Sequence, residues 1–342
     1  MKAVRFHEHG GIEVLKYEDA PEPRIRANEV LVKVKACALN HLDLWLRMGV
    51  RGWILHMPHI VGSDIAGEVA EVGSLVTRVK PGNRVLLCPG ISCGQCEACF
   101  KGLDSACRSY TLFGVMVDGG YAEYVKSPEV NAVSIPGDLS YDEAAAVPLV
   151  FITAWHMLFA RARLKPGEDV LIIGAGSGVG SAAIQIAKLV GARVIATAGA
   201  DAKLEKARAL GADEVINHTK QSIAEEVKRL TDKRGVDLVV EHVGAAVWDA
   251  CFDSLATYGR LVTCGVTTGG EVKLNVQALF GRQRAIYGSF MGSKAELLDA
   301  LKFIGQRKLK AVIDSAFPLK EAAAAQRKME SRDFFGKILL HL

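Results

Sequence analysis

Four cysteines lie close together in one short stretch of the chain and have the spacing of metal ligands. Cys93, Cys96, Cys99 and Cys107 follow the pattern C-x2-C-x2-C-x7-C. Two-residue gaps let neighbouring thiolates turn toward one ion, and the longer return completes a tetrahedral set. Since no further ligand is offered nearby, the spacing predicts one closed, structural zinc site per subunit. The alternative is a loop of reduced, buried cysteines in a reducing compartment.

Alternate glycines mark a second place where chemistry is expected. Gly174, Gly176, Gly178 and Gly180 follow the apolar run 170–173, and a helical pattern then continues to Gly191. A second β-rich run covers residues 193–197. Glycines between a buried strand and a helix start let backbone N–H groups approach a pyrophosphate, which the helix N-terminus also favours. The order of strand, turn, helix and strand therefore predicts a dinucleotide site.

The end of this second β-rich run lacks the carboxylate that would bind a ribose 2′-hydroxyl. Residues 196–199 read Ala-Thr-Ala-Gly, and the first carboxylate is Asp201 in the next turn. Lys203 lies close enough in sequence to pair with a 2′-phosphate. The sequence therefore favours NADP(H) over NAD, the alternative for Lys203 being a solvated lysine at a helix start.

Composition places these motifs in a globular protein that is long enough for two domains. The chain has 342 residues, of which 50% are hydrophobic and 23% charged, with a net charge of +4. Because both charge signs are interspersed, neither nucleic acid nor an anionic membrane is expected as the main partner. The first residues lack the apolar core of a signal peptide, and no apolar run reaches membrane length. We therefore expect a cytoplasmic protein.

Short β-rich runs precede the glycine turn, whereas strands and helices alternate after it. Residues 30–36 alternate as in a strand, and Asn40 can begin a short helix. Glycines between residues 62 and 82 separate further β-rich runs, as in an antiparallel, barrel-like domain. Ser140 and Glu143 form a capping box. The tail from Ser293 predicts two helices and a last strand at 336–341.

Four motifs in this order resemble those of the medium-chain dehydrogenase/reductase superfamily. They are GSDIAGEVAEVG, KPGNRV, DGGYAEYV and GAGSGVG. The resemblance covers essentially the whole chain and implies an α/β fold: a Rossmann doubly wound parallel sheet domain inserted in a GroES-like, mainly β catalytic domain. It implies a GroES-like domain at 1–150 with a zinc lobe at about 88–110, a Rossmann NADP-binding domain at 151–290, and a return to the catalytic domain at 291–342.

The same resemblance bears on a second, catalytic zinc. In zinc alcohol dehydrogenases of this family, the metal ligands stand at the positions of Asn40, Ser63 and Leu149. An amide, a hydroxyl and an alkyl group do not hold Zn²⁺. The pattern is similar to the quinone oxidoreductase-like branch, which transfers hydride without a metal.

The expected reaction is NADPH-dependent reduction of a small carbonyl compound, an enone or enal, or a quinone. Asn40 would donate a hydrogen bond to the developing oxyanion, Ser63 could relay a proton, and Asp43 could orient its neighbours. One alternative is a zinc-type alcohol dehydrogenase with a rebuilt metal site that draws its ligands from His41, Asp43, His59 and Asp64. Another is a non-catalytic NADPH-binding sensor or structural protein.

The glycine motif and the resemblance also imply a set of cofactor-binding residues. These are His41, Thr153, Gly174, Gly176, Ser177, Gly178, Val179, Gly180, Thr197, Gly199, Lys203, His218, Val243, Gly265, Val266, Ser289, Met291 and Lys337. His218 could instead be an ordinary loop residue, and Lys337 lies in an FGK turn like one that meets the cofactor in relatives. Apolar residues around Ile286 and the zinc lobe favour a homodimer or homotetramer.

Overall fold

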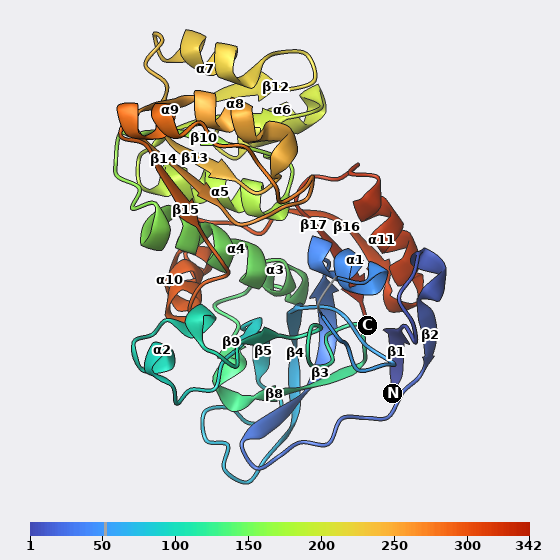
Figure 1. Ribbon diagram of the computed structural model, residues 1–342. Helices are drawn as coiled ribbons and strands as arrows, with labels where there is room; N and C mark the ends of the chain where they lie inside the picture. Colours follow the sequence, from blue (N-terminus) through green and yellow to red (C-terminus); the bar gives the residue numbers. More distant parts are fainter. Residues whose placement is uncertain (51–52) are drawn as a thin grey trace. The chain divides into compact units, whose positions relative to one another are not determined.

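The computed structural model describes residues 1–50 and 53–342. These residues fall into two compact units (Figure 1). Unit 1 comprises Met1–Leu149 and Ser293–Leu342, and unit 2 comprises Val150–Gly292. Unit 2 is thus continuous in sequence and interrupts unit 1.

Unit 1 is built on a mainly antiparallel sheet with the strand order β16-β17-β3-β4-β5-β9, and β8 also pairs with β3. In β3, Val32 and Val34 are buried whereas Lys33 between them is exposed, as the alternation of a strand requires. The strands are β3 (Glu29–Ala38), β4 (Asp64–Val72), β5 (Arg84–Leu87), β8 (Tyr124–Pro128), β9 (Ala132–Ser134), β16 (Ile313–Pro318) and β17 (Lys337–His341). Smaller ladders join β1 (Lys2–Arg5) to β2 (Lys16–Asp19) and β6 (Gly90–Ile91) to β7 (Thr111–Leu112).

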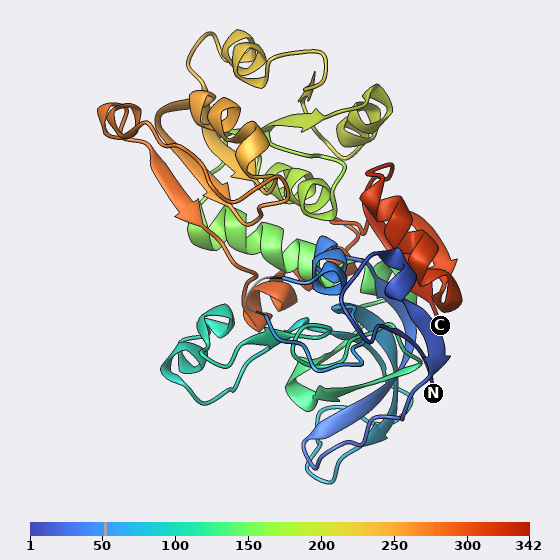
Figure 2. The same cartoon turned by 45° about the vertical axis from the view of Figure 1, so that its right-hand side comes forward.

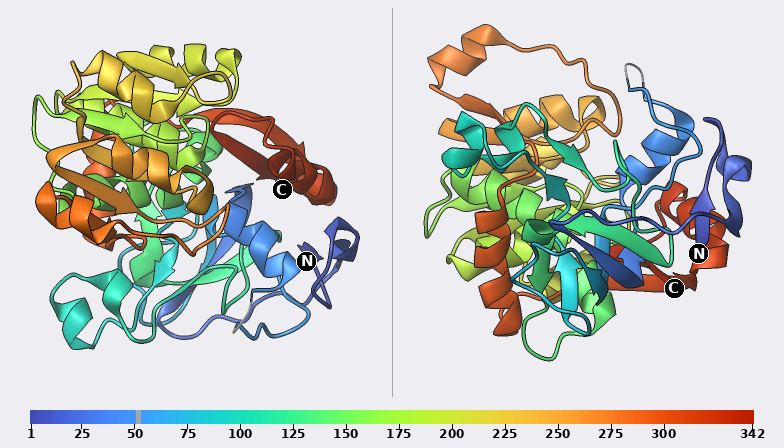
Figure 3. Two further views of the ribbon diagram at one scale, coloured as in Figure 1. Left: turned by 45° about the horizontal axis from the view of Figure 1, so that its top comes forward. Right: turned by 90° about the horizontal axis from the view of Figure 1, so that it is seen from below.

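The helices of unit 1 begin where capping residues stand in the sequence. Asn40 is the N-cap of α1 (His41–Met48). In the capping box of α3 (Tyr141–Ala145), Glu143 N–H donates to Ser140 Oγ at 3.1 Å and Ser140 N–H donates to the Glu143 carboxylate at 2.8 Å. The other helices are α2 (Glu97–Phe100), α10 (Lys294–Gly305) and α11 (Ala322–Glu330), of which α11 lies beside β16 and β17 (Figure 3). Within the described part of the chain, no helix is both long and apolar enough to span a membrane.

Unit 2 contains a parallel sheet with the strand order β12-β11-β10-β13-β14-β15 (Figure 2). The order reverses between β10 and β13, which is the switch point of a doubly wound fold. The strands are β10 (Asp169–Ile172), β11 (Arg193–Ala198), β12 (Glu214–Asn217), β13 (Val236–Glu241), β14 (Leu255–Thr263) and β15 (Ala285–Gly288). The helices are α4 (Pro148–Trp155), which leads into the unit, α5 (Gly178–Leu189), α6 (Asp201–Ala209), α7 (Ile223–Leu230), α8 (Trp248–Asp253) and α9 (Val276–Gly281).

The core of unit 2 holds the ends of the strands in place. Residues of α7 and α8 pack in one cluster with inward-facing strand residues, among them Ile223, Val227, Trp248, Phe252, Leu171, Ile195, Val239 and Leu261. Burial of such large apolar side chains contributes about 1.5–3 kcal/mol each to folding. This core fixes the carboxyl edge of the sheet, where ligands bind in doubly wound folds. The α/β fold that the sequence predicts is confirmed.

Candidate functional site

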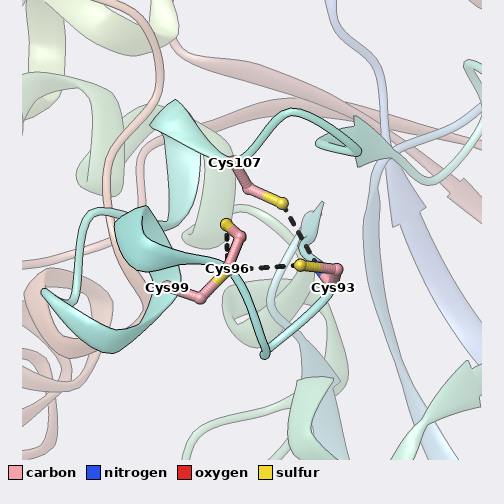
Figure 4. A group of neighbouring side chains, drawn as sticks. All are labelled: Cys93, Cys96, Cys99 and Cys107. Atoms are coloured by element: carbon pink, nitrogen blue, oxygen red, sulfur yellow. Dashed lines mark hydrogen bonds between the residues drawn. The ribbon is translucent and has the colours of Figure 1, made fainter.

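The four cysteines of the zinc lobe, residues 88–110, come together in the structure (Figure 4). Their sulfur atoms all lie within 4.8 Å of one another. Cys99 Sγ is 3.5 Å from Cys96 Sγ and 3.9 Å from Cys93 Sγ, and ligand sulfurs around a tetrahedral zinc are about 3.8 Å apart. A backbone hydrogen bond from Cys99 lowers the pKa of Cys96 to about 6, which favours the thiolate that zinc binds. The four residues therefore fit a structural zinc ion.

The zinc lobe is tied to the start of α10 by a small polar cluster. The backbone N–H of Lys294, the first residue of α10, donates to Asp104 Oδ2 at 2.7 Å. Lys294 Nζ donates to Ser92 Oγ at 3.1 Å, and Ser92 Oγ donates to Asp104 Oδ1 at 3.2 Å. An acidic side chain at a helix N-terminus is stabilised by the helix dipole. These hydrogen bonds therefore connect the structure of the zinc lobe to the first residue of α10.

The glycine turn of unit 2 has the geometry that a pyrophosphate requires. Gly174 has φ +66°, and a Cβ on Gly180 would lie 2.3 Å from the carbonyl oxygen of Gly174. Ser177 is the N-cap of α5, and its Oγ accepts a hydrogen bond from Gly180 N–H at 2.8 Å. Gly174 N–H donates to Thr197 Oγ1 at 3.3 Å. The turn thus lies at the N-terminus of α5, next to the end of β11, and the residues fit a dinucleotide.

A histidine that the sequence analysis did not select lies under this turn. His242 Nε2 is 2.7 Å from Ser177 Oγ. Burial lowers the pKa of His242 to about 4, so the imidazole is neutral near pH 7 and can accept or donate one hydrogen bond. His242 therefore holds the Ser177 side chain through this hydrogen bond.

The end of β11 brings together the residues that were expected to choose between NAD and NADP. A Cβ on Gly199 would lie 3.2 Å from His218 Nε2. Burial, together with the nearby charge of Lys203, lowers the pKa of His218. The carboxylate of Asp201 is engaged by Lys220 Nζ at 2.6 Å and by Asn217 Nδ2 at 2.5 Å. Asp201 is therefore held by its own neighbours.

The loop after β13 is anchored by Glu241, a second residue that the sequence analysis missed. This fully buried carboxylate accepts hydrogen bonds from the backbone N–H groups of Val243 and Gly244, the latter at 2.6 Å, and from Thr263 Oγ1 at 2.7 Å. A charged residue at the end of the apolar strand 236–241 was the available signal. Glu241 fixes the backbone at Val243, one of the expected cofactor contacts.

The remaining expected contacts lie on loops of unit 2 and, for Thr153, on α4. A Cβ on Gly265 would lie 2.4 Å from the carbonyl oxygen of His242, so only glycine fits there. Ser289 N–H donates to the carbonyl oxygen of Thr263 at 2.8 Å. Thr153 Oγ1 is 3.9 Å from Met291 Sδ. Val266 is exposed and reaches solvent from the same edge.

A buried polar cluster surrounds Asn40 in unit 1. Asn40 Oδ1 accepts a hydrogen bond from Lys337 Nζ at 2.7 Å, and Asn40 Nδ2 donates to Asp64 Oδ2 at 3.0 Å. Lys337 Nζ also donates to Asp64 Oδ2 at 2.8 Å. The side chains of Lys337 and Asp64 are 4% and 0% exposed. The ammonium of Lys337, expected at the cofactor, is thus engaged by Asn40 and Asp64.

Asp43 supports the same cluster from the first turn of α1. Its Oδ2 accepts hydrogen bonds from Asn40 N–H at 2.9 Å and from Tyr121 OH at 3.1 Å. Burial raises the pKa of Asp43 to about 7, against the lowering effect of the Asn40 backbone hydrogen bond and the Lys337 charge. Asp43 therefore changes its protonation state near neutral pH and fixes the backbone at Asn40.

Ser63 and Leu149 stand at two other positions where a catalytic metal would need ligands, and each makes a hydrogen bond within the protein. Ser63 Oγ donates to the carbonyl oxygen of Phe113 at 2.7 Å, which commits its proton. Leu149 offers only its backbone N–H, which donates to Asp64 Oδ1 at 2.7 Å. An amide, a committed hydroxyl and a leucine do not fit zinc.

The rebuilt metal site does not form within residues 1–50 and 53–342, where the four cysteines of the lobe are the group of ligands that converges. His59 Nε2 is 3.0 Å from the carbonyl oxygen of Gly114, and its ring packs against Phe6. The ring of His41 lies 6.3 Å from that of Trp45 and 6.4 Å from that of Phe334. Asp64 is held by Lys337.

Comparison with known proteins covers both units. Residues 26–137 match the family model for an alcohol dehydrogenase GroES-like domain, and residues 178–306 match that for a zinc-binding dehydrogenase. The chain is 33% identical to an NAD-dependent alcohol dehydrogenase of Sulfolobus acidocaldarius, with 99% of each chain covered. It is 31% identical to a quinone oxidoreductase of Rattus norvegicus, covering 100% of this chain and 98% of that one. A solved structure of an NAD-dependent alcohol dehydrogenase is similar at 46% identity and a TM-score of 0.97 over 100% of both chains.

Proposed function

Because the chain belongs to the medium-chain dehydrogenase/reductase superfamily, we propose that it reduces activated C=C bonds of enones or enals, or quinones, with NADPH and without a catalytic metal. The observation that carries this proposal is the buried cluster in which Asn40, Lys337 and Asp64 pair with one another. Amide, ammonium and a single carboxylate form a hydrogen-bonding site rather than a metal site.

The bound nucleotide supplies a hydride, and residues of unit 2 hold it. Backbone N–H groups of the turn other than those of Gly174 and Gly180, together with the N-terminus of α5, would bind the pyrophosphate. Thr197 and Gly199 face the adenosine ribose, and Lys203 and His218 meet its 2′-phosphate. Val243, anchored by Glu241, would line the nicotinamide end of the site.

In the proposed reaction Asn40 donates a hydrogen bond to the substrate oxygen on which negative charge develops. One preorganised donor of this kind contributes roughly 2.7–4 kcal/mol in comparable sites. That suffices for an enone or a quinone, since the product oxyanion is delocalised and solvent can then protonate it. Oxidation of a simple alcohol requires a lowered hydroxyl pKa, which a bound metal normally provides. The site is therefore better suited to reduction of a conjugated substrate.

A substrate panel tests this function. Benzylideneacetone, cinnamaldehyde and menadione are offered with NADPH, and ethanol and benzyl alcohol with NADP⁺ and NAD⁺, while metal content is measured on the same sample. We expect NADPH oxidation with the conjugated substrates, unaffected by a chelator on the assay timescale. Asn40→Ala should lower kcat by about 10²–10³-fold with a smaller change in KM.

Alcohol oxidation is the second candidate, since two of the similar proteins are named NAD-dependent alcohol dehydrogenases. Chelator-sensitive oxidation of ethanol or benzyl alcohol, together with no turnover of any conjugated substrate, would establish it. A second zinc ion per subunit, beyond the one proposed for the zinc lobe, would accompany that result.

The preference for NADPH rests on the end of β11, where Asp201 is engaged by Lys220 and Asn217. No acidic side chain then opposes a 2′-phosphate, and Lys203 pairs with it. Lys203→Ala should weaken NADPH binding by about 1.5–3 kcal/mol, or roughly 10–100-fold in Kd, and leave NADH binding nearly unchanged. Fluorescence titration of both cofactors measures this, with Lys206→Ala on the same helix as control. Equal affinity of the natural protein for both cofactors contradicts the assignment.

We further propose that the chain forms a homodimer or homotetramer. Over the described residues β15 is an edge strand of the parallel sheet. The neighbouring helix α9 exposes Val276 and Phe280 at 60% and 69%. An open edge beside apolar side chains is a surface that another chain can cover. Sedimentation of the natural protein and of Phe280→Glu tests this, and a monomer at micromolar concentration contradicts it.

A further inference from the structure

The surroundings of Asn40 permit only one orientation of its side-chain amide. Asn40 Oδ1 faces the ammonium of Lys337 at 2.7 Å, and Asn40 Nδ2 faces the carboxylate of Asp64 at 3.0 Å. If the amide turned over, its N–H group would face a cation and its oxygen an anion. Both contacts would be repulsive, and burial strengthens them. The ion pair therefore locks the amide in one orientation.

This lock leaves one hydrogen of the amide for another partner. An asparagine amide carries two N–H donors, and one of them is used by Asp64. The other makes only a long hydrogen bond, to the carbonyl oxygen of Ala38, at 3.5 Å from Asn40 Nδ2. That distance is longer than a normal N–H···O hydrogen bond. The second N–H is thus available as a directed donor.

The ion pair itself is held firmly, although stability alone does not require it. Asp64 Oδ1 is fixed by Leu149 N–H at 2.7 Å, while Asp64 Oδ2 meets both Lys337 and Asn40. Replacing a buried ion pair by apolar residues of similar size is often neutral or stabilising. Because the pair contacts Asn40 directly, we infer that its role is to hold the Asn40 side chain.

We propose that Lys337 and Asp64 are positioning residues that hold the Asn40 amide so that its second N–H is aimed at the substrate oxygen. The hydrogen bond from the Lys337 ammonium to Asn40 Oδ1 also polarises this N–H group. This inference rests on the proposed function of Asn40 as the donor to the developing oxyanion. It also assigns to Lys337 a role different from the cofactor contact that the sequence suggested. Chains of polarised hydrogen bonds strengthen one another in a low-dielectric interior.

The test compares variants that avoid an unpaired buried charge. The double variant Asp64→Asn/Lys337→Met removes both charges together, and Lys337→Arg keeps the cation. Glu168→Gln/Arg260→Met is the matched control, because it removes an ion pair of unit 2, with N···O distances of 3.0 and 2.6 Å, far from Asn40 in sequence. Thermal unfolding confirms that each variant is folded. NADPH Kd, kcat, KM and the isotope effect with NADPH deuterated at C4 are then measured with benzylideneacetone and menadione.

The proposal predicts a loss in kcat that depends on Asn40. The double variant should lower kcat at least tenfold and raise the isotope effect, with NADPH Kd within about twofold of the natural protein. Lys337→Arg should recover part of kcat, and the control pair should leave kcat unchanged. When Asn40→Ala is already present, adding the double variant should have no further effect, since residues that act through one group are not additive.

Other outcomes overturn the inference and remain distinguishable from failure of the proposed function. An unchanged kcat in a folded double variant means that the pair is only structural. A raised NADPH Kd with unchanged kcat means that Lys337 meets the cofactor. Full additivity with Asn40→Ala means that the pair acts independently. If Asn40→Ala itself leaves kcat unchanged while enones or quinones are still reduced, the function stands but neither Asn40 nor its two neighbours has the role proposed.

Discussion

Two polar regions of unit 1, the zinc lobe and the cluster around Asn40, differ in burial and in charge. The zinc lobe keeps four thiols within 4.8 Å of one another near the surface. The cluster around Asn40 is buried and holds an ammonium paired with a carboxylate. In the lobe, several anionic ligands require a dication. Around Asn40, the cation of Lys337 is paired directly with the carboxylate of Asp64.

The two regions differ in the source of their positive charge, which is a metal ion in one and a lysine side chain in the other. A zinc ion is taken up from solution, and its binding depends on the metal concentration and on deprotonated ligands. Lys337 is part of the chain, so the single charge of its ammonium does not depend on metal supply. Removal of zinc from the lobe should therefore leave the Asn40 cluster unaffected. The two regions can be tested separately, by variants of each.

The largest effect is expected from the lobe. Cys107→Ser should abolish stoichiometric zinc, which we propose at about one ion per subunit, and lower stability by several kcal/mol, because structural zinc binding contributes about 10–16 kcal/mol even in small zinc-binding peptides. Elemental analysis and thermal unfolding measure this. Cys88→Ala, a buried cysteine outside the cluster, is the control and should retain the metal. Full zinc content in Cys107→Ser would contradict the ligand assignment.

A smaller but still large effect is expected when only one member of the ion pair is removed. Asp64→Asn leaves the Lys337 ammonium buried without its carboxylate, which should cost about 3–5 kcal/mol. The double variant Asp64→Asn/Lys337→Met should recover most of that loss, since no charge is then unpaired. Urea unfolding of the zinc-loaded protein measures both. An equal loss in the single and double variants would show that the two charges do not depend on each other.

The smallest effect concerns pH and has opposite signs in the two regions. The folded pKa of Asp43 is raised to about 7, whereas the unfolded value is about 3.9. The folded state therefore keeps a proton that the unfolded state releases, so stability due to Asp43 is full below pH ~4 and is lost as pH rises toward 7. Zinc binding in the lobe has the reverse dependence, because protons compete with the metal.

Asp43→Asn should make the loss of stability between pH 5 and pH 7 smaller by about 1–2 kcal/mol. Asp299→Asn, on the exposed side of α10, serves as control because its carboxylate pairs only with Lys302 at the surface. Denaturant unfolding at several pH values provides the measurement. The same slope in Asp43→Asn and in the natural protein would mean that Asp43 is ionised throughout.

The sequence predicts those parts of the molecule whose cause is local. Gly174 is recognisable because the turn needs its positive φ, and Gly180 because a Cβ there would meet the carbonyl oxygen of Gly174. The sequence order of strand and helix identifies the parallel sheet. The cysteine spacing likewise specifies a metal site, because Cys93, Cys96 and Cys99 lie within seven residues. The family and the α/β fold that followed from these motifs are confirmed.

What the sequence could not predict depends on partners that are distant along the chain. Lys337 and Asp64 are 273 residues apart, and the sequence suggested a cofactor contact for Lys337 rather than an ion pair with Asp64. The support of Ser177 by His242 is of the same kind, with 65 residues between them. The first contact exists because β17 and β4 lie on either side of β3. The second exists because β10 and β13 are neighbours in the parallel sheet.

The position of Lys337 in β17, the last strand of the chain, also determines when the site can exist during protein synthesis. Asp64 leaves the ribosome 273 residues before its partner, which corresponds to roughly 14–55 s at usual translation rates. Unit 2 is complete as a continuous segment only after Gly292 is added, late in that interval, and β3 then still lacks the neighbour that β17 provides. A chain that is cut short near its end therefore has a finished nucleotide-binding unit, an open strand edge and a buried carboxylate without its cation. The edge is closed and Asp64 gains its cation only when β17 is in place.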